Sequence, residues 1–210
     1  MSGDANESIA VLDSGVPIHD YVLTESAYAD SFDSIPVRSL PETDFTDVAT
    51  LVVPYKTNQE VLRSERDQIE EYISTGGTVL AFGDVFRQWL PGGTWYPVEF
   101  DYTWWARGEK LEVEILEPAH PLFADVSSDA YTWHYHGRFD PPTDATPLLA
   151  APEGVIMYEP RLVTGTLLAT TIDPLHHLGD GEITNPIDTT SALDRVLAWA
   201  REPEGRLTDE

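Results

Sequence analysis

The 210-residue chain carries 37 Asp and Glu residues against 12 Lys and Arg residues, which gives a formal net charge of −25 at pH 7. No basic run is present to neutralise phosphates, so the composition argues against nucleic acid and anionic membranes as partners. Cysteine is absent, which excludes disulfides, thiolate ligands and cysteine nucleophiles. Hydrophobic residues make up 41% of the chain, enough for a folded core despite the charge.

The negative charge is spread along the chain and is expected at the surface. Its self-repulsion would weaken the compact state in dilute buffer, whereas molar salt shortens the Debye length to about 3 Å and suppresses the repulsion. We therefore expect a halophilic protein, adapted to molar salt. Residues 1–8 have no features of a signal peptide and no apolar run approaches membrane-spanning length, so a cytoplasmic protein is expected.

Short apolar runs alternate with amphipathic segments along the chain, which is typical of an α/β fold. In chain order, strands are expected at 9–12, 35–38, 48–53, 78–82, 111–116, 131–136, 147–150, 154–158 and 165–172, and helices at about 18–30, after residue 64 and at 190–201. Apolar strands joined through short helices predict a parallel sheet that is covered on both faces. We expect one α/β domain over residues 1–210, with an insertion rich in Trp and Tyr at 86–108.

The aromatic insertion admits two interpretations. As a hairpin or flap, its rings would cover the edge of the sheet. As the wall of a binding site, Trp104 and its neighbours would stack on a sugar or another flat ligand. The aromatic residues alone do not decide between the two.

Polar side chains follow several predicted strands at their carboxyl ends, where open α/β sheets build binding sites. Lys56 and Thr57 follow the third strand, Asp84 the fourth and Asp173 the last. An ammonium group at this edge could hold a carboxylate, a phosphate or a developing oxyanion, although a surface ion pair would equally explain Lys56. We expect a small-molecule ligand to be bound by Lys56, Thr57, Asp84 and Trp104.

Histidines form a second candidate group. In a strand over 131–136, His134 and His136 would project from the same face. The candidate ligands for a divalent transition metal are His134, His136, His176 and His177. The candidate general acids and bases are His134, His136, Asp173 and His176. Core histidines bonded to carbonyls or carboxylates would show the same spacing. No phosphate-binding glycine motif is present, so no nucleotide cofactor is expected.

The order of these segments resembles the class I glutamine amidotransferase-like fold, a flavodoxin-like three-layer sandwich with a mostly parallel sheet. The resemblance is carried by the third strand with its turn, the Gly-Gly-Thr-Val-Leu-Ala-Phe-Gly-Asp strand, the 165–177 segment and the closing Leu-Asp-Arg-Val-Leu-Ala-Trp-Ala helix. More narrowly, His120-Pro121-Leu122-Phe123 followed by Asp129-Ala130-Tyr131 resembles the trehalose-utilisation (ThuA-like) branch. Beside these motifs, His120 precedes a proline and is expected to support a turn.

This resemblance implies that glutamine hydrolysis is lost. The family's amidotransferases place a nucleophilic cysteine where this chain has Gly83, and a catalytic His-Pro-Glu turn where it has Asp173-Pro174-Leu175. The ThuA-like branch commonly lacks that cysteine and is associated with carbohydrate metabolism, which implies a sugar-related ligand. Members of the fold often pair through exposed helices or edge strands, so a homo-oligomer is also implied.

Two functions are therefore left open. The first is a binding or accessory module that recognises a small polar ligand or a partner subunit. The second is a hydrolase or isomerase that uses a metal or a His/Asp pair.

Overall fold

The computed structural model describes residues 8–99, 104, 107–131, 135–179 and 190–202. Its strands are β1 (Ile9–Asp13), β2 (Asp33–Pro36), β3 (Thr50–Val53), β4 (Thr78–Phe82), β5 (Thr94–Pro97), β6 (Glu114–Ile115), β7 (Gly137–Asp140), β8 (Thr146–Ala151), β9 (Gly154–Glu159) and β10 (Thr166–Thr170). Its α-helices are α1 (Pro17–Thr24), α2 (Gln59–Ser64), α3 (Arg66–Ser74) and α4 (Thr190–Arg201). Short 3₁₀ turns include η4 (Pro121–Phe123), η5 (Ser128–Tyr131) and η6 (His176–Gly179). None of the described helices is long and apolar enough to cross a bilayer.

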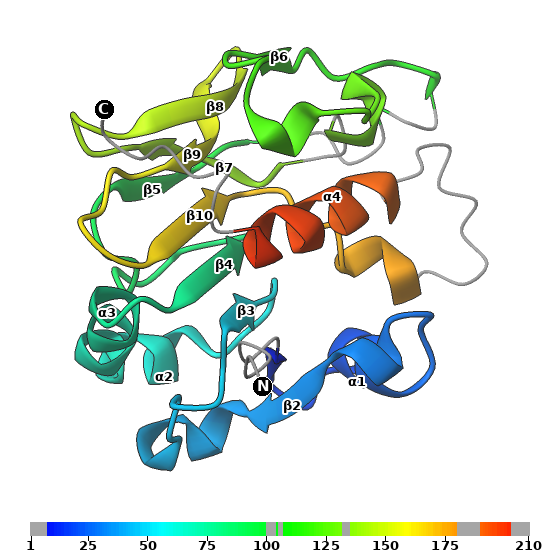
Figure 1. Ribbon diagram of the computed structural model, residues 1–210. Coiled ribbons are helices and arrows are strands. Elements are labelled where there is room, and N and C mark those ends of the chain that lie inside the picture. The colour runs from blue at the N-terminus through cyan, green and yellow to red at the C-terminus, as the bar shows by residue number, and fades with distance from the viewer. Residues whose placement is uncertain (1–7, 100–103, 105–106, 132–134, 180–189, 203–210) are drawn as a thin grey trace.

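The strands form one mixed sheet in the order β2-β1-β3-β4-β10-β9-β7-β5, with β8 and β6 attached through β9 (Figure 1). Strands β2, β1, β3, β4 and β10 are parallel, as expected. The remaining pairings are antiparallel, so the sheet is parallel over only half of its strands. For the β8–β9 and β9–β10 pairs the reason is the length of the connection, because these loops are too short for the crossover that a parallel pair needs.

Two apolar cores cover the two faces of the sheet and produce the expected three layers. In β1, Ile9 and Val11 point to the face that is covered by α1 and α4. The alternate residues Ala10 and Leu12 point to the face that is covered by α2 and α3. Figure 1 shows α4 lying across the sheet and α2 and α3 lying together at the opposite side. The alternation follows from the two-residue period of a strand.

The described part of the aromatic insertion extends the sheet. Strand β5 lies at the end of the strand order and pairs with β7, and Trp89 and Trp95 are buried in the core on the α2–α3 face. The Trp95 ring lies against Gly137, where a Cβ would come within 2.3 Å of the indole. Phe86 and Tyr96 are exposed. Trp89 and Trp95 are therefore core residues of this part of the sheet, and Phe86 and Tyr96 lie at its surface.

The predicted strand over 131–136 is wrong, because none of its described residues, 131, 135 and 136, lies in a strand. Tyr131 ends the turn η5, and strand β7 begins only at Gly137. The Tyr131 ring is buried against Phe123, and its hydroxyl donates to the carbonyl of Leu122. The aromatic residue at position 131 of the alternating sequence pattern is therefore explained by burial of the Tyr131 ring, and it does not indicate a strand. His134 lies outside the described residues.

Candidate functional site

The carboxyl ends of three parallel strands bring the predicted polar residues to one edge of the sheet. Lys56 follows β3, Asp84 follows β4 and Asp173 follows β10, and these three strands are adjacent. His136 joins them because β7 begins where β10 ends, with Thr171 Oγ1 accepting from the His136 and Gly137 amides at 3.3 and 3.1 Å. The edge therefore collects residues from segments that are more than 100 positions apart in the sequence.

The turn after β3 holds Lys56 in an unusual backbone conformation. The amide of Thr57 donates to the carbonyl of Pro54 at 3.2 Å, which closes a four-residue turn. Within this turn Lys56 has φ of 68°, in the left-handed region that favours glycine. The side chain of Lys56 is exposed, whereas Thr57 is buried and its hydroxyl donates to the same carbonyl. Thr57 thus has a turn-forming role, and Lys56 is the group presented to solvent.

Three contacts from other segments fix this turn. The amide of Tyr55 donates to Asp173 Oδ2 at 2.9 Å. The carbonyl of Tyr55 accepts from His19 Nε2 at 2.8 Å, and the amide of Asn58 donates to Ser14 Oγ at 3.0 Å. A residue in a disfavoured conformation persists only where its surroundings over-determine the backbone, and such strain concentrates at functional sites.

The ring of Tyr55 fills the corner after β4. A Cβ built on Gly83 would lie 2.8 Å from the Cβ of Tyr55, so the corner has no room for a side chain. The same ring makes edge contacts with His136 and His176, at centroid distances of 4.9 and 5.4 Å. Lys56 Nζ lies 5.3 Å from the Tyr55 centroid. The candidate groups therefore converge on one tyrosine.

Asp84 and His136 form an acid–base pair at this edge. Asp84 Oδ1 lies 3.3 Å from His136 Nδ1, and the two side chains are 7% and 14% exposed. Their orientation is not that of a hydrogen bond, because Asp84 Oδ1 has no hydrogen-bond partner among the described residues. A buried carboxylate oxygen with spare acceptor capacity can bind a ligand hydroxyl.

Asp173 serves mainly as an anchor. Burial raises the pKa of its carboxyl, while the charge of His176 and the backbone N–H groups of Tyr55, Leu175 and His176 act in the opposite direction. Both carboxyl oxygens are occupied, one by the Tyr55 amide and the other by the Leu175 amide at 2.8 Å. The carboxyl is therefore positioned to hold the turn together and has no oxygen free of backbone contacts.

The site includes His19, which the sequence did not single out. His19 lies on α1 and is 2% exposed, and burial lowers the pKa of its imidazole. The sequence could have indicated His19 as a site residue, since it is the one histidine that follows the first strand closely. Its partner, however, is the backbone carbonyl of Tyr55, which no side-chain motif reveals.

The other candidates are distributed differently. Trp104 is 5% exposed and offers little ring surface for stacking. His134, together with the side chain of His177, lies outside the described part of the molecule. Among the residues that are described, no three His, Asp or Glu side chains gather as a metal site.

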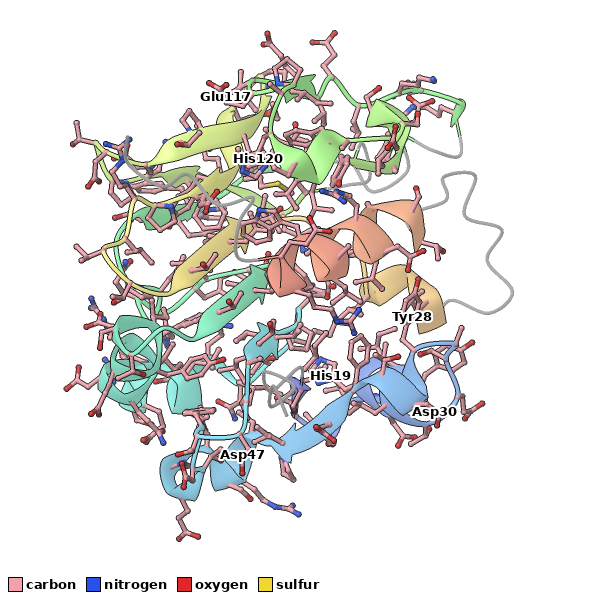
Figure 2. All side chains as sticks on the ribbon, viewed as in Figure 1. His19, Tyr28, Asp30, Asp47, Glu117 and His120 are labelled. Carbon is pink, nitrogen blue, oxygen red and sulfur yellow. The ribbon has the colours of Figure 1, made fainter. Side chains whose placement is uncertain are left out.

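The His120 motif has a structural role away from this edge, as expected. His120 Nδ1 accepts from the amide of Leu122, and Nε2 therefore donates to Glu159 Oε2 at 3.0 Å in a buried pair. The His120 ring also packs on Trp199 of α4. Figure 2 shows His120 in the upper half of the molecule and His19 in the lower half, beside α1.

A cavity of about 830 Å³ lies at the opposite edge of the sheet. It is lined by the first residues of β3 and β4, Thr50 and Thr78, and by Phe45, Tyr72 and Arg201. Its size suits a ligand. None of the residues gathered around Tyr55 lines this cavity, so the largest space described and the polar candidate residues lie at opposite edges of the sheet. We place the functional site at the edge that carries the polar candidate residues.

Solved structures share this architecture. A cytoplasmic protein from Salmonella typhimurium has a TM-score of 0.61 at 10% identity, over 92% of this chain and 99% of that one. A glutamine amidotransferase from Thermotoga maritima has a TM-score of 0.56 at 15% identity, over 94% and 95%. A ThuA-like protein from Bacteroides uniformis has a TM-score of 0.53 at 13% identity, over 98% and 97%. The chain has the class I glutamine amidotransferase-like fold.

This amidotransferase-like fold is shared at sequence identities too low to carry an activity from one protein to the other. No protein-family model and no curated protein matches the sequence. Within the fold, the corner after β4 is where the resemblance places a cysteine nucleophile. Here the corner is Gly83, covered by Tyr55.

Proposed function

We propose that this protein binds a small polyhydroxylated anion, such as a sugar acid, at the carboxyl edge of its parallel strands, without amidotransferase chemistry. The observation that carries the proposal is the conformation of Lys56, which has φ of 68° in a turn fixed by Asp173, His19 and Ser14. Holding a non-glycine residue there costs about 1–2 kcal/mol. A functional role for the ammonium group explains why a lysine, and not a glycine, occupies this left-handed position.

The neighbours of Lys56 define the class of ligand. Its ammonium group can pair with a carboxylate, and the Asp84–His136 pair offers acceptors and donors for hydroxyl groups. The likeness to a ThuA-like protein supports a carbohydrate-related ligand, because that branch is associated with carbohydrate metabolism. A neutral sugar of the same size would lose the contact with Lys56.

Calorimetric titration with gluconate and with glucose in 2 M KCl tests this proposal. We expect gluconate to bind more tightly than glucose, and Lys56→Met to remove the difference. Lys110→Met is the matched control, since Lys110 is the other lysine of the chain and its ammonium group pairs with the surface carboxylate of Asp129. Equal binding of both sugars, or equal effects of the two substitutions, would contradict the proposal.

A second candidate function is acid–base catalysis by a hydrolase or isomerase. The 3.3 Å separation of Asp84 and His136 favours it, because a carboxylate beside an imidazole stabilises the positive charge that forms when the imidazole takes a proton as general base. Turnover of a panel of sugar esters and keto or aldo sugars would be measured for the wild type, Asp84→Asn and His136→Gln. Turnover that survives both substitutions would exclude this pair as the acid–base group.

A divalent transition metal belongs to this second candidate, with ligands from His134, His136, His176 and His177. Elemental measurement on protein purified in KCl without chelator, repeated on His134→Ala/His136→Ala, tests it. A near-stoichiometric metal that is lost in the variant would support a metalloenzyme. Absence of metal from both proteins would contradict it.

A further inference from the structure

We propose that His19 is a positioning residue: its neutral imidazole holds the Lys56 turn in the ligand-binding shape, and its protonation lowers the affinity of the site. This inference rests on the proposed function for its affinity readout. It adds regulation by pH to that function and assigns the regulation to His19, which acts through the backbone of the Lys56 turn.

The hydrogen bonds of His19 fix its tautomer. The amide of Ser14 can only donate, so the imidazole nitrogen that it meets at 3.1 Å, Nδ1, must be an acceptor. The proton is then on Nε2, which donates to the carbonyl of Tyr55 at 2.8 Å. One neutral ring therefore connects the turn after β1 to the turn after β3.

Protonation would break one side of this connection. A proton on Nδ1 turns that atom into a donor facing the donor N–H of Ser14, so the contact becomes repulsive. Ser14 also accepts from the amide of Asn58, the residue that follows the Lys56 turn. Displacement of Ser14 would therefore weaken two contacts that hold the Lys56 turn, the bond from Ser14 to His19 and the bond from Asn58 to Ser14.

Charged groups around the imidazole come from four segments. Asp13 at the end of β1 lies 3.8 Å from Nδ1 and favours the proton, and Lys56 in the turn after β3 opposes it. Asp173, after β10, lines the same small cavity as His19, and the nearby His176 interacts with Asp173. Burial is the largest influence and keeps the imidazole neutral.

The cavity beside His19 leaves little room for solvent to replace the lost bond. The cavity beside His19 measures about 10 Å³ and is lined mainly by apolar residues, including Val11, Ile18 and Val22. This is at the lower limit of the space that one water needs, and a water also needs polar partners. A protonated His19 must therefore move or carry an unsatisfied contact.

Two substitutions separate the two halves of the connection. In His19→Gln the side-chain amide can still donate to the Tyr55 carbonyl, but it does not titrate. In His19→Asn the shorter amide can still accept from Ser14, but it does not reach Tyr55. We expect each variant to weaken gluconate binding at pH 7.5, with Asn weakening it about tenfold, the effect of losing one well-made hydrogen bond to the turn. Gln keeps only the bond to Tyr55, as the protonated wild type does, so its affinity at pH 7.5 should match the low-pH affinity of the wild type.

The decisive measurement is gluconate affinity from pH 7.5 to 4.5 in 2 M KCl, together with amide hydrogen exchange at Ser14. Gluconate keeps its charge over most of this range. In the wild type we expect affinity and Ser14 protection to fall together as the pH decreases. In His19→Gln the steep part of the affinity profile should be absent. All other ionisable groups are the same in both proteins, so the difference between the two profiles reports His19.

Parallel pH profiles in the wild type and His19→Gln would overturn the inference, as would constant Ser14 protection in the wild type. Failure of the wild type to bind gluconate at pH 7.5 would instead count against the proposed function. The exchange measurement needs no ligand, so it would still decide whether His19 holds the turn through a proton-sensitive bond.

Discussion

The Cβ of Tyr55 occupies the space that a side chain at Gly83 would need, because a Cβ added to Gly83 would approach it to 2.8 Å. In this fold the corner after β4 is where an amidotransferase nucleophile is expected. Tyr55 is itself held by Asp173 and His19 through its amide and carbonyl groups. The packing of Tyr55 thus leaves no room for any side chain at the Gly83 corner.

Replacing Gly83 by Ala should therefore destabilise the protein by about 2–4 kcal/mol, from a left-handed φ of 80° together with the clash with Tyr55. Gly15→Ala is the matched control, because Gly15 has φ of 70° with nothing within 4 Å of the added Cβ. Chemical unfolding of both variants measures the difference. Equal losses would mean that Tyr55 yields to the added methyl group.

Lys56→Gly should raise the free energy of unfolding by about 1 kcal/mol while it weakens gluconate binding, because glycine adopts φ of 68° without strain. Asp125→Gly removes a similar strain at φ of 60°, in the loop that follows η4. We expect that control to gain stability with no change in binding. A loss of stability in Lys56→Gly would show that the ammonium group itself supports the fold.

Stability should increase with salt. The net charge of −25 generates repulsion that molar KCl screens, so the thermal midpoint should rise between 0.1 and 2 M KCl. Calorimetry across that range checks the expectation. A midpoint that falls or stays constant would contradict adaptation to high salt.

His120→Ala should destabilise the protein by about 3–5 kcal/mol, because it leaves Glu159 buried without its partner. Glu159→Gln should cost much less, since an amide oxygen can still accept from His120 Nε2. Unfolding in urea compares the two. Both variants should bind gluconate normally once folded, and lost binding in Glu159→Gln would connect this pair to the site.

His19 should also make stability depend on pH. Its native pKa lies below 6.5 because the imidazole is buried, so the unfolded chain takes up a proton before the native protein does. The free energy of unfolding should therefore fall as the pH decreases below 6.5, until the native imidazole is also protonated. His19→Gln should lack this part of the dependence, whereas Asp173 titrates in both proteins. Identical profiles of the two proteins in urea unfolding would show that His19 is not held neutral.

Several elements followed from local patterns in the sequence. The apolar runs of β1, β3, β4 and β10 predicted buried parallel strands, since only such strands need apolar residues on both faces. The carboxyl ends of adjacent parallel strands must share one edge, which is why Lys56, Asp84 and Asp173 could be placed together. His136 reached the same edge for a different reason, the offset of β7 against β10.

By itself the sequence determined the charge, the absence of cysteine, the parallel half of the sheet and the edge at which polar residues gather. Only the tertiary structure decided the antiparallel half, the filling of the Gly83 corner by Tyr55 and the contact of His19 with the Tyr55 carbonyl. The antiparallel half depends on short loops that reverse the direction of the chain, and the other two features depend on contacts between side chains and backbone groups. Every residue carries the same amide and carbonyl, so residue type does not reveal which of them a side chain will meet.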